Sequence, residues 1–222
     1  MAHPWPLFDL RIRTPRLELR VPTDDDLLAL AGVVSAGVHD LPFSPFLVPW
    51  DELPSPALER QFLQHWWKVR GSWSPQNWTL GLAVVADGHP IGMQDVTGRD
   101  FAHRRVAVTG SWLGISHQGR GYGTEMRAAV LHLAFAELGA LVAESGYAEG
   151  NTASARVSEK LGYVPNGVRI HAYGSARRVE QMVRVTPETW SRDLVPVTEE
   201  GMDACRGLFG EQDLPSGAWA VL

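Results

Sequence analysis

The 222-residue sequence has a single cysteine, Cys205, so it cannot build a disulfide framework within the chain. No apolar run reaches about 18 residues, so no membrane span is expected. Against 25 acidic residues stand 20 Lys and Arg, giving a net charge of −5 that offers no support for nonspecific nucleic-acid binding. The eight histidines show no metal-ligand spacing, and we expect no metal. The N-terminus lacks the continuous apolar core of a signal peptide. We therefore expect a soluble, cytoplasmic protein.

The overall composition is that of an ordinary globular protein, with 45% hydrophobic and 20% charged residues. Period-two alternation and apolar stripes at helical spacing predict the elements. We expect strands at 16–22, 78–87, 90–98, 106–116, 140–148, 163–174 and 177–186, and helices at 23–37, 57–73, 122–138 and 151–162. A Gly88-His89 turn should join the second and third strands, and Pro187 should start one more helix. The five prolines and large apolar side chains of residues 39–56 predict a packed loop. The tail beyond about residue 194 is too weakly patterned to predict an element.

Three glycines at alternate positions, Gly119, Gly121 and Gly123, lie at the start of the helix expected at 122–138. Glycine costs roughly 1 kcal/mol relative to alanine inside a helix, so this run indicates a loop that something approaches closely. Unpaired amides and the helix dipole make a helix start an anion site. The spacing fits neither a P-loop nor G-x-G-x-x-G. A glycine-rich turn without a ligand is the alternative interpretation.

With Gln118 and Arg120 the loop reads Q-x-x-G-x-G, which resembles the acyl-CoA pyrophosphate loop of the GNAT superfamily of N-acyltransferases. "TPRLELRVPTDDD" resembles the opening strand and helix of the RimJ/RimL-type branch, and "NTASARVSEKLGYVPNG" resembles that branch's N-x-x-S helix and the strand entry after it. These segments occur in the expected order across residues 14–186. "WPLFDLRI", "GVHD", "GSWLG" and "GYGTEMRAAVL" are similar to actinobacterial GNAT proteins described as succinyl-CoA-dependent.

The resemblance implies an α/β (α+β) fold with a mixed, mostly antiparallel central sheet, splayed at the acyl-CoA site and with helices on both faces. It implies one GNAT domain over residues 1–222, with a core at about 14–186 and a C-terminal extension at 187–222. We also expect a homo-oligomer.

The resemblance further implies an acyl-CoA-dependent N-acyltransferase with no permanently bound cofactor, in which an amine attacks the thioester of CoA directly. Asn151 corresponds to the motif residue that contacts the pantetheine arm, although it could simply N-cap its helix. Ser154 corresponds to the motif serine that assists the departing thiolate, or else is a surface residue. The implied CoA-binding residues are Leu113, Gly114, Ile115, Gln118, Gly119, Arg120, Gly121, Tyr122, Gly123, Thr124, Asn151 and Ser154.

The general base stays open at the sequence level. Some GNAT enzymes carry a glutamate on the splayed strand, but "VTGSWLGIS" has none. Glu144 on the following strand and the pair His39 and Asp40 in "GVHD" are the candidates, and His39 is also a candidate for acceptor binding. Gln94 and Asp95 interrupt an apolar strand, and Gln94 is a candidate acceptor-binding residue. For each of them a satisfied structural polar group is the alternative.

The remaining expectations concern the acyl donor and the acceptor amine. The resemblance favours succinyl-CoA over acetyl-CoA as donor, and a succinyl carboxylate would need a cation to offset its desolvation. The sequence offers Arg99, Arg104 and Arg105 for this, or these form an exposed basic turn. The acceptor is an amine on a small molecule, on a protein N-terminus or on a lysine. A non-catalytic CoA-binding or regulatory module is the second function class, favoured by the missing glutamate.

Overall fold

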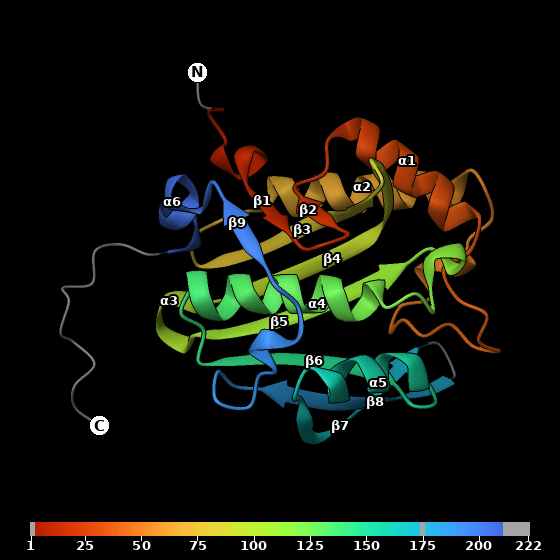
Figure 1. The fold of residues 1–222 in the computed structure, drawn as a ribbon. Coiled ribbons are helices and arrows are strands. Elements are labelled where there is room, and N and C mark those ends of the chain that lie inside the picture. Colours follow the sequence, from red (N-terminus) through yellow and green to blue (C-terminus); the bar gives the residue numbers. More distant parts are fainter. Residues whose placement is uncertain (1–2, 174–175, 211–222) are drawn as a thin grey trace.

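The computed structural model describes residues 3–173 and 176–210. Within them nine strands form one sheet in the order β7-β8-β6-β5-β4-β3-β2-β1-β9 (Figure 1). The strands are β1 (Arg11–Arg13), β2 (Glu18–Arg20), β3 (Asn77–Ala86), β4 (His89–Arg99), β5 (Val106–Leu113), β6 (Val142–Ala148), β7 (Val164–Tyr173), β8 (Ala176–Val185) and β9 (Thr198–Glu200). All neighbours are antiparallel except β5 and β6, which are parallel. The expected mixed, mostly antiparallel sheet is confirmed.

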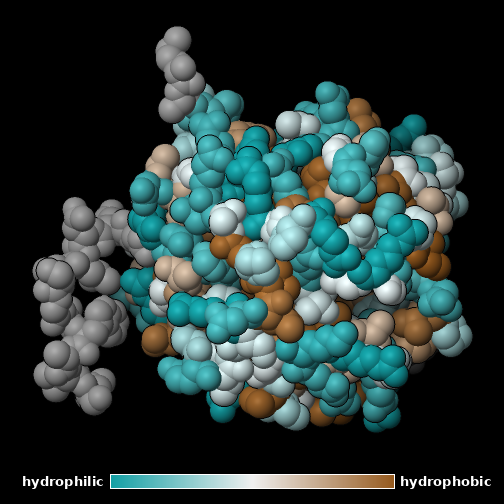
Figure 2. Space-filling view, viewed as in Figure 1, coloured by the Kyte–Doolittle hydropathy of each residue, from teal (hydrophilic) through white to brown (hydrophobic). Residues whose placement is uncertain are grey.

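Helices cover both faces of this sheet, as expected. They are α1 (Asp24–Ser35), α2 (Ala57–Gly71), α3 (Phe101–Arg104), α4 (Tyr122–His132), α5 (Thr152–Lys160) and α6 (Met202–Cys205). Helices α1 and α2 share one apolar cluster with the sheet, and α4 belongs to a second cluster on the opposite face. Figure 1 shows α4 crossing the near face and α2 lying behind the sheet. Figure 2, in the same view, shows a largely hydrophilic surface with scattered hydrophobic patches.

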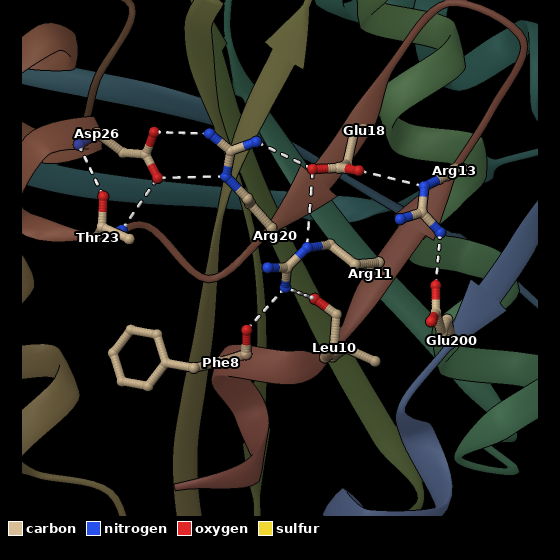
Figure 3. Close-up of polar contacts among 9 residues, drawn as sticks. All are labelled: Phe8, Leu10, Arg11, Arg13, Glu18, Arg20, Thr23, Asp26 and Glu200. Atoms are coloured by element: carbon tan, nitrogen blue, oxygen red, sulfur yellow. Dashed lines mark hydrogen bonds and ion pairs between the residues drawn. The ribbon is translucent and has the colours of Figure 1, made fainter. Parts of the chain in front are cut away.

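Helix α1 begins as its sequence predicts. The Thr23 hydroxyl accepts from the Asp26 amide (3.1 Å), and the Asp26 carboxylate accepts from the Thr23 amide (3.0 Å), which forms a capping box. Arg20 of β2 donates to the same carboxylate at 2.8 Å (Figure 3). Burial alone would raise the pKa of Asp26, but these bonds outweigh it and the pKa is lowered. The helix start is therefore tied to the sheet.

Strand β9 lies at the edge of the sheet, beside β1. It belongs to the C-terminal segment for which the sequence predicted no element. Arg13 of β1 donates to Glu200 of β9 (2.8 Å) and to Glu18 of β2 (3.2 Å) (Figure 3). Strand β1 itself was also missed. Neither β1 nor β9 was predicted from its sequence, and their pairing with each other was seen only in the structure.

Two local predictions are wrong. No helix starts at Pro187, because the amides of Thr189 and Trp190 both donate to the Thr186 carbonyl and close a turn. The buried Trp190 indole then packs against Phe135, with 5.3 Å between the ring centroids. The β3–β4 turn is Asp87-Gly88, with φ of 50° and 79°, one residue earlier than predicted. In the loop at 39–56, which contains one short 3₁₀ helix, Trp50–Glu52, Phe46 and Trp50 pack against the α1/α2 cluster as expected, whereas Leu47, Val48 and Leu53 are exposed. Residues 211–222 of the predicted extension and 174–175 of the last predicted hairpin lie outside the described residues.

Candidate functional site

The glycine loop leads directly into α4 and has the backbone of an anion site. Gly119 and Gly121 have φ of 73° and 85°, the left-handed region that residues with a Cβ rarely adopt. A Cβ at Gly119 would meet no atom within 4 Å, so its outer side is open. In the described structure the amides of residues 119–123 donate no hydrogen bond, whereas the Thr124 amide donates to the Gly121 carbonyl (3.1 Å). Five free amides thus remain for a ligand.

Side chains distant in sequence hold this loop in place. Gln118 Nε2 donates to the Val38 carbonyl (2.7 Å) and the Leu113 carbonyl (2.9 Å), so the side chain braces the loop against its neighbours. Arg16 donates to the Arg120 carbonyl (3.0 Å) and forms a 2.5 Å ion pair with the buried carboxylate of Glu125. The sequence analysis missed Arg16 and Glu125. The only signal was an acid in the first turn of the helix.

Strands β5 and β6 separate beside the loop. Their pairing ends at Val108 and Glu144, while β4 and β5 stay paired as far as Gly92 and Leu113. This opening, which we call the fork, is the splay that the resemblance implies. In an antiparallel ladder alternate residues direct their backbone groups to one neighbour. Since the Gly114 amide bonds to Ile91 of β4, the amides of Ser111 and Leu113 face the fork.

The predicted donors at the end of β5 are therefore only partly available. The Gly114 amide is bonded to the Ile91 carbonyl (2.9 Å) and the Ile115 amide to the Gly37 carbonyl (3.0 Å). Leu113 keeps an amide that faces the fork, and Ser111, which the sequence analysis did not single out, adds a second.

Helix α5 starts beyond the other side of the fork. The Asn151 side chain accepts from the Ser154 amide (3.1 Å), so it is an N-cap, the structural alternative considered above. No hydrogen bond from the Ser154 hydroxyl is recorded in the described structure, and the residue is partly exposed. Val157 of the same helix lies 3.5 Å from the position of a Cβ on Gly123, an ordinary packing distance, so the contact between α4 and α5 does not by itself require the third glycine.

His39 lies next to the end of β5, because residues 37 and 38 bond to Ile115 and Gln118. Its Nε2 is 2.7 Å from the buried carboxylate of Asp51, which also accepts from the Ser44 hydroxyl (2.8 Å). With Nε2 donating to this carboxylate, Nδ1 is the basic nitrogen. Nδ1 is buried and has no partner among the described residues.

The other acid–base candidates lie elsewhere on the sheet. Glu144 is the last residue of β6 paired with β5, and its carboxylate accepts from Asn166 (3.1 Å). Gln94 is fully buried, shares the α4 face, and donates to the Gly110 carbonyl (2.8 Å). Asp95 lies on the α1/α2 face, with its carboxylate over Gly110. Burial raises the pKa of Asp95 from 3.8 to about 7, although the charge of Arg127 opposes this.

The arginines that the sequence offered for a donor carboxylate are far from the fork. Arg99 ends β4, Arg104 ends α3, and Arg105 precedes β5. Four residues of β5, 106–109, lie between Arg105 and Gly110, and the five steps at about 3.3 Å per residue make roughly 17 Å. Arg105 instead donates to the Leu138 carbonyl (3.0 Å). These arginines therefore lie at the end of β5 where β5 and β6 are still paired, because the strand runs away from the turn before the two strands separate.

No group of three or more potential metal ligands occurs among residues 3–173 and 176–210. None of the helices in that part of the chain has the length and apolar character needed to cross a bilayer.

Comparison with known proteins places these features in context. The family model described as "Acetyltransferase (GNAT) domain" matches residues 16–164. Mycobacterium smegmatis RimJ in complex with CoA-disulfide is similar in structure, with TM-score 0.64, 21% identity, 82% of this chain and 90% of that chain covered. RimL, the ribosomal L7/L12 alpha-N-protein acetyltransferase in complex with CoA, is similar with a TM-score of 0.59 and 16% sequence identity. The match covers 78% of this chain and 95% of that chain. A spermidine N-acetyltransferase chimera of Vibrio cholerae SpeG and hSSAT has a TM-score of 0.59 and 15% sequence identity. The match covers 77% of this chain and 95% of that chain.

Proposed function

The chain belongs to the GNAT acetyltransferase family, and from this we propose that it transfers an acyl group from CoA to an amine by direct attack on the thioester. The observation that carries the proposal is the loop of residues 119–123, whose five amides are free at the start of α4, next to the fork. The open side of Gly119 fits a pyrophosphate against bare backbone. CoA supplies the thioester, and these residues bind and orient it.

The fork supplies the next requirement. An amine attacking a thioester produces negative charge on the carbonyl oxygen, and fixed donors aimed at that charge are usually the largest catalytic contribution. The amides of Ser111 and Leu113 face the fork and are suited to this role. Ser154, on α5, is the candidate for assisting the departing thiolate.

We assign the general base to His39. Asp51 orients the imidazole and leaves a basic Nδ1, which is the arrangement of a positioned general base. Glu144 is less suited, because its carboxylate is engaged by Asn166 at the closed end of the fork. His39→Gln should then lower kcat by about 10²-fold, and Glu144→Gln should retain most activity. The reverse pattern would move the base to Glu144.

The acceptor and donor are narrower proposals. RimL supports a protein N-terminus as acceptor, and the spermidine enzyme supports a polyamine. A thiol-release assay with acetyl-CoA and succinyl-CoA, over N-terminal peptides, lysine peptides and polyamines, tests both. Absence of thiol release with every amine, together with tight CoA binding, would favour a non-catalytic CoA-binding module, the alternative supported by a β5 that carries no carboxylate. A cytoplasmic location and a homo-oligomeric state stay predictions.

A further inference from the structure

Two glycines lie across the fork from each other, and each leaves room for a carboxylate. They are Gly110 of β5 and Gly146 of β6, both two residues past the last residues at which these strands pair. A Cβ on Gly110 would lie 2.8 Å from Oδ2 of Asp95, and a Cβ on Gly146 would overlap the carboxylate of Glu180. Asp95 belongs to β4 and Glu180 to β8. The outer neighbour of each fork strand thus places an acid beside the opening.

The fork is accessible to solvent at this point. Gly110, Ser111 and Trp112 are partly exposed, although β5 is an inner strand of the sheet. Ala107, at the paired end of the same strand, is fully buried. Asp95 is also partly exposed, although the protein atoms around its carboxyl are dense enough to raise its pKa. A ligand in the fork can therefore reach this carboxyl.

Asp95 differs from the other acids beside the fork in its partners. Glu180 pairs with His171 (2.9 Å), and Glu144 accepts from Asn166 (3.1 Å). Among the described residues no side chain donates to the Asp95 carboxylate, which is bonded by the backbone of Gly110 instead. A carboxylate can accept several hydrogen bonds, so this one has capacity for a further donor.

The charges around Asp95 show which donor would suit it. Arg127, on the α4 face, donates to the hydroxyls of Ser111 (3.0 Å) and Ser145 (3.1 Å), one on each side of the fork. The charge of Arg127 lowers the pKa of Asp95, but burial outweighs it and leaves the pKa at about 7. A cation against the carboxyl would favour its ionised form further. An ammonium group in the fork would thus complete the ionisation of Asp95.

The proposed base lies on the same side of the sheet. Trp112 follows Gly110 by two residues in β5, so both face the α1/α2 cluster, to which the indole belongs. Trp112 packs against Trp50, with 6.0 Å between the ring centroids, and Trp50 precedes Asp51, the partner of His39. An aromatic ring beside a carboxylate is a favourable setting for an ammonium group.

We propose that Asp95 binds the ammonium group of the acceptor on the α1/α2 face of the fork and holds its nitrogen against the thioester carbonyl. This inference rests on the proposed acyl-CoA site and adds the residue that recognises the acceptor. Ser111, whose amide is suited to the carbonyl oxygen, directly follows Gly110, so acceptor and thioester meet there. Proton removal stays with His39. Uncharged amines would lack the charge-assisted contact, so the fork selects cationic acceptors.

The test needs no identified acceptor. It compares binding of S-(3-aminopropyl)-CoA, S-butyl-CoA and free CoA to the full chain at pH 8 by calorimetric titration. The two thioethers have arms of the same length, which end in an ammonium group and in a methyl group. We expect the wild type to bind the aminopropyl thioether about 10- to 100-fold more tightly than the butyl thioether, the factor for a hydrogen bond to a charged group.

The isosteric variant Asp95→Asn should abolish this ratio and keep the affinity for free CoA. The control, Glu144→Gln, removes another carboxylate beside the fork and should keep the ratio. A ratio that survives in folded Asp95→Asn would make Asp95 a structural acid and overturn the proposal. Loss of the ratio in Glu144→Gln as well would assign it to diffuse negative charge, which also overturns the proposal.

The wild-type comparison is decisive without any variant, because equal affinities for the two thioethers overturn the proposal. Binding of free CoA together with equal thioether affinities leaves the proposed N-acyltransferase intact. Absence of all CoA binding in the wild type contradicts both.

Discussion

Replacing Gly121 by valine separates ligand binding from folding at the glycine loop. Gly121 has φ of 85°, and a residue with a Cβ pays about 1–2 kcal/mol there. The new Cβ would lie 3.2 Å from Arg16 Nη2, so Arg16, which is ion-paired with Glu125, must shift by a few tenths of an ångström, while the rest of the fold should survive. The branched methyl groups would, however, stand where the pyrophosphate approaches the free amides.

The expected loss of CoA affinity follows from those amides. A hydrogen bond to a charged group contributes about 1.5–3 kcal/mol, so losing two corresponds to at least about 10²-fold in Kd. Gly167→Val is the matched control, because Gly167 also has a positive φ (95°) and open space around it but lies in β7, away from the loop. Both variants should lose similar thermal stability, and only Gly121→Val should lose CoA binding in a calorimetric titration. Wild-type affinity in a folded Gly121→Val protein would refute the pyrophosphate assignment.

Two further predictions concern chemistry and pH. Ser154→Ala should lower kcat by about 10²-fold with CoA affinity nearly unchanged, and steady-state kinetics showing no change would make Ser154 a surface serine. Asp95 has its pKa raised in the folded state from 3.8 to about 7, so the unfolded chain releases this proton first and folding stability falls as pH rises between these values. Denaturant unfolding at pH 5 and pH 8 should show that Asp95→Asn removes this fall, on the order of a few kcal/mol at most; an identical pH slope in both proteins would contradict the raised pKa.

Long, strongly periodic segments were predictable from the sequence. The β3–β4 hairpin, α4 and the glycine loop follow from alternation, an apolar stripe and residues whose backbone needs are local. Local chemistry also gave the start of α1, because Thr23 and Asp26 lie three residues apart. The resemblance to a known family supplied the splay between β5 and β6, which no local pattern encodes.

The parts that failed depend on contacts between distant segments. Arg127 reads as one more polar residue on a helix until β5 and β6 bring Ser111 and Ser145 to its guanidinium. Likewise, nothing around His39 in the sequence indicates Asp51 as its partner across a proline-rich loop. The β5 amides could not be assigned from sequence either, since which of them face the fork depends on the register with β4.

The pairing of β1 with β9 has a consequence for the order in which the molecule assembles. Its ion pair between Arg13 and Glu200 joins residues 187 positions apart, so nearly the whole described chain forms the loop that this pairing closes. The three residue pairs between β1 and β9 can offset the entropy cost of closing this loop only after the rest of the sheet has brought the two segments together. Strand β9 should therefore dock last and open first. In native-state hydrogen exchange its amides would report local opening, while those of β3 and β4 report global unfolding.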